Sequence, residues 1–208
     1  MEIRKIIRKS CNMNVYDEEN HKYYVDGEEK PSVTEIANPI SFERLNALQE
    51  TLLERARARG SRCHELFEEY LLIGDLDIEE IETDYIPYVQ QFVLWCKTYR
   101  PKVIYTEKKL FGDEFCGTAD CLAKIDNEIV LIDYKTTSAL DVKSLSVQLA
   151  GYKILVEKTT DLKVDRCMVL HLKKDSYSYR EITPNYEWFE ILLKHNKFMR
   201  SKYNAQKK

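Results

Sequence analysis

Two aspartates and a lysine stand in the middle of the chain, in segments whose other residues are mostly apolar. Asp120 follows the turn-like stretch 117–119, and Asp133 and Lys135 follow the apolar run 130–132. Because that run is apolar on both alternating faces, it is typical of a strand that is covered on both sides. A charge in such a strand is costly unless it is paired or binds a metal. We therefore interpret these three residues as a candidate site.

The residues between the two segments indicate how the segments face each other. Asp126 and Asn127 tolerate the left-handed conformations of a tight hairpin turn. A two-residue turn there would place Asp120 opposite Asp133, with both carboxylates on one face of the sheet. A turn longer by one residue would separate them, so the interpretation depends on register. Lys135 shares the face of Asp133 because side chains alternate along a strand.

Two facing carboxylates beside a lysine predict a site for a hard divalent cation. Mg²⁺ or Mn²⁺, as one or two ions bound through carboxylates, waters and phosphate, suits this set of ligands. The alternatives are a surface ion pair for Asp133 and Lys135, and a turn cap for Asp120. The covered strand disfavours the first alternative, and the hairpin register disfavours the second.

At these residues the chain resembles the PD-(D/E)xK nuclease superfamily, in particular its RecB-like exonuclease branch with its phage-type members. The resemblance spans residues 16–172, and it is specific because several short motifs occur in the right order on the right expected elements. These motifs are Gly117-Thr118-Ala119-Asp120, Asp133-Tyr134-Lys135, Gln148-x-x-x-Tyr152, the Arg59-Gly60 step before His64, and the amino-terminal stretches 21–27 and 31–36.

The resemblance implies a role for each matched residue. Lys135 would orient or deprotonate a water molecule or neutralise phosphoryl oxygens, and Gln148 and Tyr152 would position the DNA backbone or the lysine. The implied residues are Asp120, Asp133, Lys135, Gln148 and Tyr152 for catalysis; His64, Asp120, Asp133 and the Tyr134 carbonyl for metal binding; Glu107 in support; and Arg59 and Arg62 for DNA binding.

Several of these residues also have simpler interpretations. A helical histidine such as His64 is often a polar residue at the edge of a core. Glu107, beside two lysines, is consistent with a side chain that faces solvent. Tyr152 alone would fit core packing, with Gln148 solvated one turn away. The arginines around residue 59 would equally suit a solvated helix surface.

The implied activity is metal-dependent hydrolysis of DNA phosphodiester bonds by an exonuclease. It would act on free ends of single- or double-stranded DNA in repair, recombination or phage DNA processing. The alternatives are a structure-specific endonuclease of the same fold and a protein that binds nucleic acid without cutting it; the presence of every motif residue favours the enzyme. An unrelated magnesium-dependent phosphohydrolase would leave His64 and the Gln148-x-x-x-Tyr152 motif unexplained. DNA is the expected partner, with self-association or a recombination protein as further candidates.

The composition is that of a globular protein. The chain has 208 residues, 44% of them hydrophobic and 32% charged, with a net charge of −3. No apolar run is long enough for a membrane span and the start lacks a secretory signal pattern, so we expect a cytoplasmic protein of a bacterial or phage-infected cell. Six scattered cysteines indicate neither a zinc motif nor disulfides, and no iron–sulfur cluster is expected.

The order of helical and strand patterns predicts an α/β fold with a restriction-endonuclease-like core, in which a central mixed sheet is flanked by helices. We expect one PD-(D/E)xK nuclease domain over residues 1–208, with residues 1–40 as an amino-terminal hairpin extension. The expected elements are a hairpin over 15–25; a helix that begins at Ser41 and is interrupted at Gly60; helices over 63–72, 85–99 and 142–157; strands over 103–111, 116–125, 128–136, 166–172 and 177–182; and a last helix from Pro184.

Overall fold

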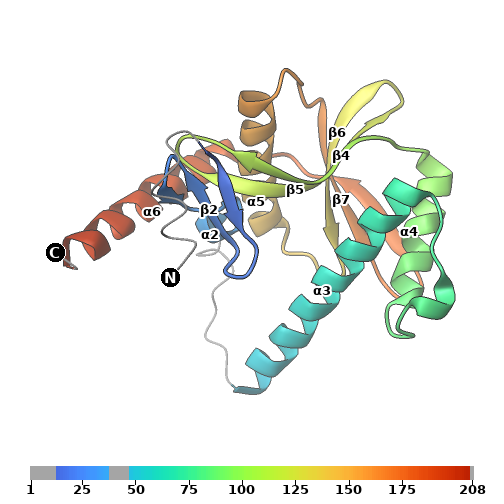
Figure 1. Cartoon of the computed structure of the whole chain (residues 1–208). Coiled ribbons are helices and arrows are strands. Elements are labelled where there is room, and N and C mark those ends of the chain that lie inside the picture. Colours follow the sequence, from blue (N-terminus) through green and yellow to red (C-terminus); the bar gives the residue numbers. More distant parts are fainter. Residues whose placement is uncertain (1–12, 38–46, 207–208) are drawn as a thin grey trace.

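The computed structural model describes residues 13–37 and 47–206, which form two β-sheets and a set of helices (Figure 1). The helical elements are α2 (Val33–Ala37), α3 (Ala47–Ile73), the short 3-10 helix η2 (Ile78–Glu80), α4 (Ile86–Tyr99), α5 (Val142–Thr159) and α6 (Tyr186–Gln206). The small sheet contains β1 (Val15–Asp17), β2 (Lys22–Val25) and β3 (Glu28–Lys30). The large sheet contains β4 (Lys102–Phe111), β5 (Cys116–Ile125), β6 (Glu128–Lys135), β7 (Arg166–Leu172) and β8 (Tyr177–Glu181).

The large sheet is mixed, as the sequence predicts. Its strands lie in the order β4-β5-β6-β7-β8, and every neighbouring pair is antiparallel except β6 and β7. Parallel neighbours need a long crossover connection, and α5 supplies it here. The predicted elements from 103 to 182 match the observed strands and α5 to within two residues.

Helices cover both faces of this sheet and bury two separate apolar clusters. One face packs against α2, α5 and α6, and the other packs against α3 and α4 (Figure 1). The central strand β6 contributes to both clusters, since Leu131 lies in the first and Val130 and Ile132 lie in the second. All three side chains are at most 1% exposed, as expected for a strand covered on both sides.

The predicted hairpin register is confirmed. Asp126 and Asn127 have positive φ angles of 50° and 70°, so they form the two-residue turn. Ile125 pairs with Glu128, and the ladder continues from there to Cys121 and Ile132.

The expected interruption at Gly60 is wrong. The helix α3 runs without a break from Ala47 to Ile73 and includes Gly60. A glycine inside a helix costs only about 1 kcal/mol relative to alanine, which the packing of the helix can offset. The expected helix start at Ser41 lies outside the described residues.

The small sheet is attached to the large one near the start of β5. The Cys116 N–H donates to the Pro31 carbonyl at 2.9 Å, and Ser32 bridges to Cys116. The hydroxyls of Tyr23 and Thr118 are 2.7 Å apart, which ties β2 to β5. Although α3 and α6 are long, none of the described helices combines the length and apolarity needed to cross a membrane.

Candidate active site

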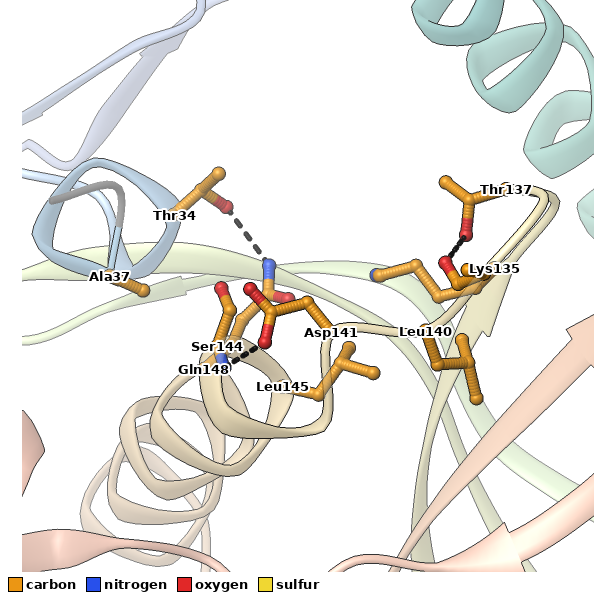
Figure 2. Close-up of a pocket in the computed structure, with 10 residues that line it drawn as sticks. Thr34, Ala37, Lys135, Thr137, Leu140, Asp141, Ser144, Leu145 and Gln148 are labelled. Atoms are coloured by element: carbon orange, nitrogen blue, oxygen red, sulfur yellow. Dashed lines mark hydrogen bonds between the residues drawn. The ribbon is translucent and has the colours of Figure 1, made fainter. Parts of the chain in front are cut away.

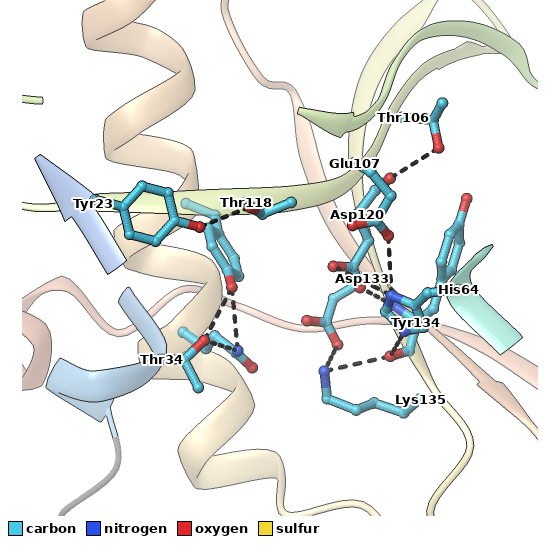
Figure 3. A network of polar contacts seen from close by, with 12 residues as sticks. Tyr23, Thr34, His64, Thr106, Glu107, Thr118, Asp120, Asp133, Tyr134 and Lys135 are labelled. Atoms are coloured by element: carbon cyan, nitrogen blue, oxygen red, sulfur yellow. Dashed lines mark hydrogen bonds and ion pairs between the residues drawn. The ribbon is translucent and has the colours of Figure 1, made fainter. Parts of the chain in front are cut away.

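The candidate site lies where β5 and β6 separate. The ladder between the two strands ends at Cys121 and Ile132, one step before the predicted pair of Asp120 and Asp133. The Asp120 carboxylate occupies the next position, and its Oδ2 accepts a hydrogen bond of 2.7 Å from the Tyr134 N–H. A side chain thus replaces a strand partner there, which holds Asp120 firmly against the end of β6 (Figure 3).

Asp133 and Lys135 form a close ion pair on the face of β6 opposite to that of Tyr134. Lys135 Nζ lies 2.5 Å from Asp133 Oδ2 and 3.4 Å from the Tyr134 carbonyl oxygen. The Asp133 side chain is only 3% exposed, whereas that of Lys135 is 26% exposed and reaches the cavities beside it. The Tyr134 ring packs in the cluster under α3 and α4, so its carbonyl group is fixed at the site.

His64 reaches the same point from α3. Its Nδ1 lies 3.0 Å from Glu107 Oε1 and 3.9 Å from Asp120 Oδ1, and its Nε2 lies 3.3 Å from the Tyr134 carbonyl oxygen (Figure 3). Glu107 has a φ of 45°, a left-handed conformation that typically costs 1–3 kcal/mol in a residue with a Cβ atom. Such strain is often found at functional sites, where the surrounding structure enforces it.

Burial and neighbouring charges shift the pKa values of these groups. Burial raises the pKa of Asp120, and it raises that of Asp133 to about 6 although Lys135 opposes the shift. Burial alone would lower the pKa of His64, but the carboxylates of Asp120 and Glu107 outweigh it and raise the pKa to about 9. Burial also acts against the charged form of Lys135, yet Asp133 and Asp120 raise its pKa.

The donor atoms present fit a divalent cation. Ligand atoms of His64, Glu107 and Asp120 all lie within 4.8 Å of one another. Two carboxylates and an imidazole, with the Tyr134 carbonyl oxygen beside them, form a set that suits Mg²⁺ or Mn²⁺. Glu107, which the sequence supports only through the resemblance, is part of this group. Asp133 adjoins the group and is paired with Lys135.

Gln148 and Tyr152 lie one turn apart on α5 and meet a residue from α2. Thr34 Oγ1 is 3.3 Å from both Gln148 Nε2 and the Tyr152 hydroxyl, and Gln148 Nε2 is 3.4 Å from that hydroxyl. Lys135, Gln148 and Thr34 line one cavity of about 340 Å³ (Figure 2). The triangle of polar contacts therefore forms a wall of the site beside the lysine.

The two predicted DNA-binding arginines lie on another side of α3. The Arg59 guanidinium stands 5.7 Å from the centre of the Tyr88 ring, and Arg62 pairs with Glu65 and Glu82. A cleft of about 730 Å³ runs between α3 and the β1–β2 hairpin, and neither arginine lines it. Arg57 and Lys109 line the cleft together with His64.

Sequence reasoning missed the position of Thr34, and it included Arg57 only as one of the arginines near His64, without singling it out. Thr34 lies within the stretch 31–36 that carries the resemblance, but its contact with α5 joins residues 114 positions apart. Arg57 precedes His64 by seven residues, which is two helical turns. A helix that continued through Gly60 would have placed Arg57 and His64 on one face, so the false interruption concealed this signal.

Comparisons with known proteins give structural matches only. No protein-family model matches the sequence, and no curated protein matches it either. A phage-related exonuclease from Haemophilus somnus 129PT is similar in structure, with a TM-score of 0.44 and 13% sequence identity, over 85% of this chain and 94% of that one. An alkaline exonuclease from Laribacter hongkongensis has a TM-score of 0.44 and 12% identity, over 86% of this chain and 94% of that one.

Identity and TM-score are low in both cases. The functional argument therefore rests on the side chains of this chain and on their geometry.

Proposed function

We propose that this protein is a deoxyribonuclease that depends on Mg²⁺ or Mn²⁺ and hydrolyses phosphodiester bonds from free DNA ends. One observation carries the proposal: the donor group of His64, Glu107 and Asp120 adjoins the ion pair of buried Asp133 and partly exposed Lys135 at the wall of an open cleft. Free ends arise in DNA repair, recombination and phage DNA processing, and we place the activity among these processes.

Each residue of the group has a defined task in this proposal. His64, Asp120, Asp133 and the Tyr134 carbonyl oxygen would hold the metal, while Glu107 fixes the imidazole through Nδ1. A bound divalent cation would supply a water of lowered pKa and would stabilise charge on the scissile phosphate. The backbone N–H of Tyr134 keeps the Asp120 carboxylate in place for this purpose.

Lys135 supplies a cation beside the proposed metal ligands Asp133 and the Tyr134 carbonyl oxygen. Asp133 holds its ammonium group, and the partly exposed side chain lines both cavities that meet there. From this position it can neutralise a phosphoryl oxygen or orient the attacking water. Gln148 and Tyr152, braced by Thr34, would position the DNA backbone beside the lysine.

The decisive experiment compares the digestion of end-labelled linear DNA with that of covalently closed circles. Linear and covalently closed circular substrates, single- and double-stranded, would be incubated with the protein in Mg²⁺, Mn²⁺, Ca²⁺ or EDTA. We expect shortening of linear DNA from its ends in Mg²⁺ or Mn²⁺, little cutting in Ca²⁺, whose looser geometry positions water poorly, and none in EDTA. Efficient linearisation of closed duplex circles would instead indicate an endonuclease.

Matched variants connect this activity to the site. Asp120→Asn, Asp133→Asn and Lys135→Met should each abolish cutting and leave the fold intact. The controls are Asp161→Asn and Lys173→Met, which change exposed residues of the same types away from the cleft. Near-native cutting by any of the three site variants at saturating metal would contradict the proposal.

A further inference from the structure

Aromatic side chains from the amino-terminal hairpin border the candidate metal group. Tyr16 and His21 line the same cleft as His64 and Glu107. They also line a neighbouring cavity of about 360 Å³, together with Thr118, which lies two residues before Asp120 on β5. The cleft therefore has one wall that carries acidic metal donors and another that carries aromatic rings.

The Tyr16 ring packs against a second ring, which is tilted by 42° relative to it. Tyr16 pairs with Tyr23 across β1 and β2, and their ring centres are 4.7 Å apart. Tyr23 is 5% exposed, packs its ring edge-on against Phe111 at 5.8 Å and bonds through its hydroxyl to Thr118. Tyr16 is thus the outer, partly exposed ring of an aromatic cluster that is anchored to β5.

The hairpin turn places an imidazole beside this ring. Asp17 accepts hydrogen bonds from the N–H and the side-chain amide of Asn20, at 3.2 and 3.0 Å, which fix the turn. His21 then adopts a φ of 50°, and its Nδ1 lies 2.8 Å from the Tyr16 hydroxyl. A strained residue that lines a cleft is the kind of feature that points to a function.

A cation completes the arrangement. Lys109 Nζ lies over the Tyr16 ring, 5.7 Å from its centre, and Lys109 also lines the cleft. An aromatic face next to a basic side chain is the combination that single-strand binding proteins use, since bases stack on the ring and the cation contacts the phosphates.

We propose that Tyr16, positioned by Tyr23 and His21, is a stacking platform for an unpaired nucleobase next to the scissile phosphate. The preferred substrate is then single-stranded DNA, or the frayed end of a duplex. The reason is that a paired base would first have to leave its stack, at a cost that is lowest for a base that is already single-stranded. This inference rests on the proposed nuclease function and adds its substrate class.

The test compares kcat/KM on a single-stranded oligonucleotide and on a blunt duplex of the same sequence. Stacking on one aromatic side chain corresponds to a loss of about 5- to 150-fold when the ring is removed. We expect Tyr16→Leu, which keeps apolar contact with Tyr23, to lower kcat/KM on the single strand by a factor in this range. Tyr16→Phe should stay within about twofold of wild type, because it keeps the ring.

Two controls make the result specific. Tyr24 follows Tyr23 on β2, and its side chain points to the other face of the hairpin. Tyr24→Ala should therefore leave kcat/KM unchanged on both substrates. A single-stranded oligonucleotide that has abasic nucleotides at the cleaved end offers no base to stack, so Tyr16→Leu should not slow its cleavage further. Equal losses on the single strand, the duplex and the abasic strand would overturn the platform.

A binding measurement distinguishes a failure of this inference from a failure of the proposed nuclease function. Fluorescence anisotropy in EDTA measures the affinity for the labelled single strand without any cutting. If the wild-type protein bound the strand but never cut DNA, and Tyr16→Leu bound it more weakly, the stacking role of Tyr16 would be supported and the nuclease function would be wrong. If the protein cut DNA and Tyr16→Leu changed neither affinity nor kcat/KM, only the stacking role would be wrong.

Discussion

At the scale of single residues, the site concentrates five ionisable side chains that would be unstable if buried alone. Three carboxylates, from Glu107, Asp120 and Asp133, surround His64 and Lys135. With both cations protonated the group has an excess of one negative charge, so an added divalent cation is electrostatically favoured. Histidine must release its proton to bind a metal, which couples metal affinity to pH.

The first prediction concerns this coupling. Because the pKa of His64 is raised to about 9, protons should compete with the metal throughout the neutral range. The metal concentration that gives half of the maximal rise in melting temperature should therefore decrease from pH 7 to pH 9. In His64→Ala that concentration should be higher and should depend much less on pH. Thermal-shift titrations with Mn²⁺ measure this concentration and its pH dependence in both proteins. An unchanged metal dependence in His64→Ala would indicate that His64 has only a structural role.

The second prediction concerns stability without metal. The pKa of Asp133 is raised from its ordinary 3.8 to about 6 in the folded protein, so the folded state binds more protons than the unfolded state between these values. The contribution of Asp133 to stability is therefore most favourable below pH 4 and is lost as the pH rises through 6. The asparagine of Asp133→Asn does not titrate. The melting temperature of this variant minus that of the wild type, both measured in EDTA, should therefore increase by several degrees between pH 4.5 and pH 8.

The exposed Asp161→Asn serves as the control, and its difference from wild type should not follow this trend. A difference between Asp133→Asn and wild type that stayed constant from pH 4.5 to pH 8 would contradict the raised pKa of Asp133.

At the scale of elements, local patterns predict what depends on neighbours in sequence and fail where distant segments meet. The Asp126-Asn127 turn fixes the register of β5 and β6 because both residues adopt positive φ angles. The ladder nevertheless ends one residue pair early, because the Asp120 side chain accepts the hydrogen bond of the Tyr134 N–H. The contact of Thr34 with α5 is likewise a tertiary contact that no local pattern contains.

Gly60 in helix α3 is another position where a local sequence pattern gave the wrong prediction. Gly60 was expected to interrupt the helix because glycine has a low helix propensity, but packing against the large sheet keeps the helix continuous. A Cβ atom at position 60 would meet Thr136 Oγ1 at 4.0 Å, an ordinary contact distance.

The third prediction follows from this geometry. Gly60→Ala should stabilise the protein by about 0.5–1 kcal/mol, because alanine loses less backbone entropy in a helix. Urea unfolding with and without the substitution measures the difference. The matched control is Gly151→Ala on α5, where the Cβ atom would lie 2.5 Å from a ring carbon of Phe189 and should destabilise the protein instead. A destabilised Gly60→Ala would show that the helix needs glycine there.

At the scale of the whole molecule, a net charge of −3 requires that any attraction for DNA come from local arrangement. The long helix α3 separates its arginines by face. Arg57 lines the cleft with His64, whereas Arg59 lies against Tyr88 and Arg62 is paired with two glutamates. Lys109 faces the same cleft from β4, so two cations flank the path that leads to the metal donors.

The last prediction uses this division between faces. Each phosphate contact contributes about one unit to the slope of log affinity against log salt concentration. Arg57→Ala should therefore weaken DNA binding by a similar factor for all sequences and should reduce the slope by about one. Arg62→Ala should leave both nearly unchanged, because Arg62 lies outside the cleft and is already paired with Glu65 and Glu82. Anisotropy titrations with two oligonucleotides of unrelated sequence measure both the affinity and the salt slope. The salt concentration is varied between about 50 and 200 mM, the range over which affinity that depends on phosphate contacts falls steeply.

The same titrations on Arg59→Ala test the sequence-based expectation that Arg59 binds DNA. If Arg62→Ala flattened the slope and Arg57→Ala did not, DNA would follow the α4 side of the helix, and the cleft would not be its path.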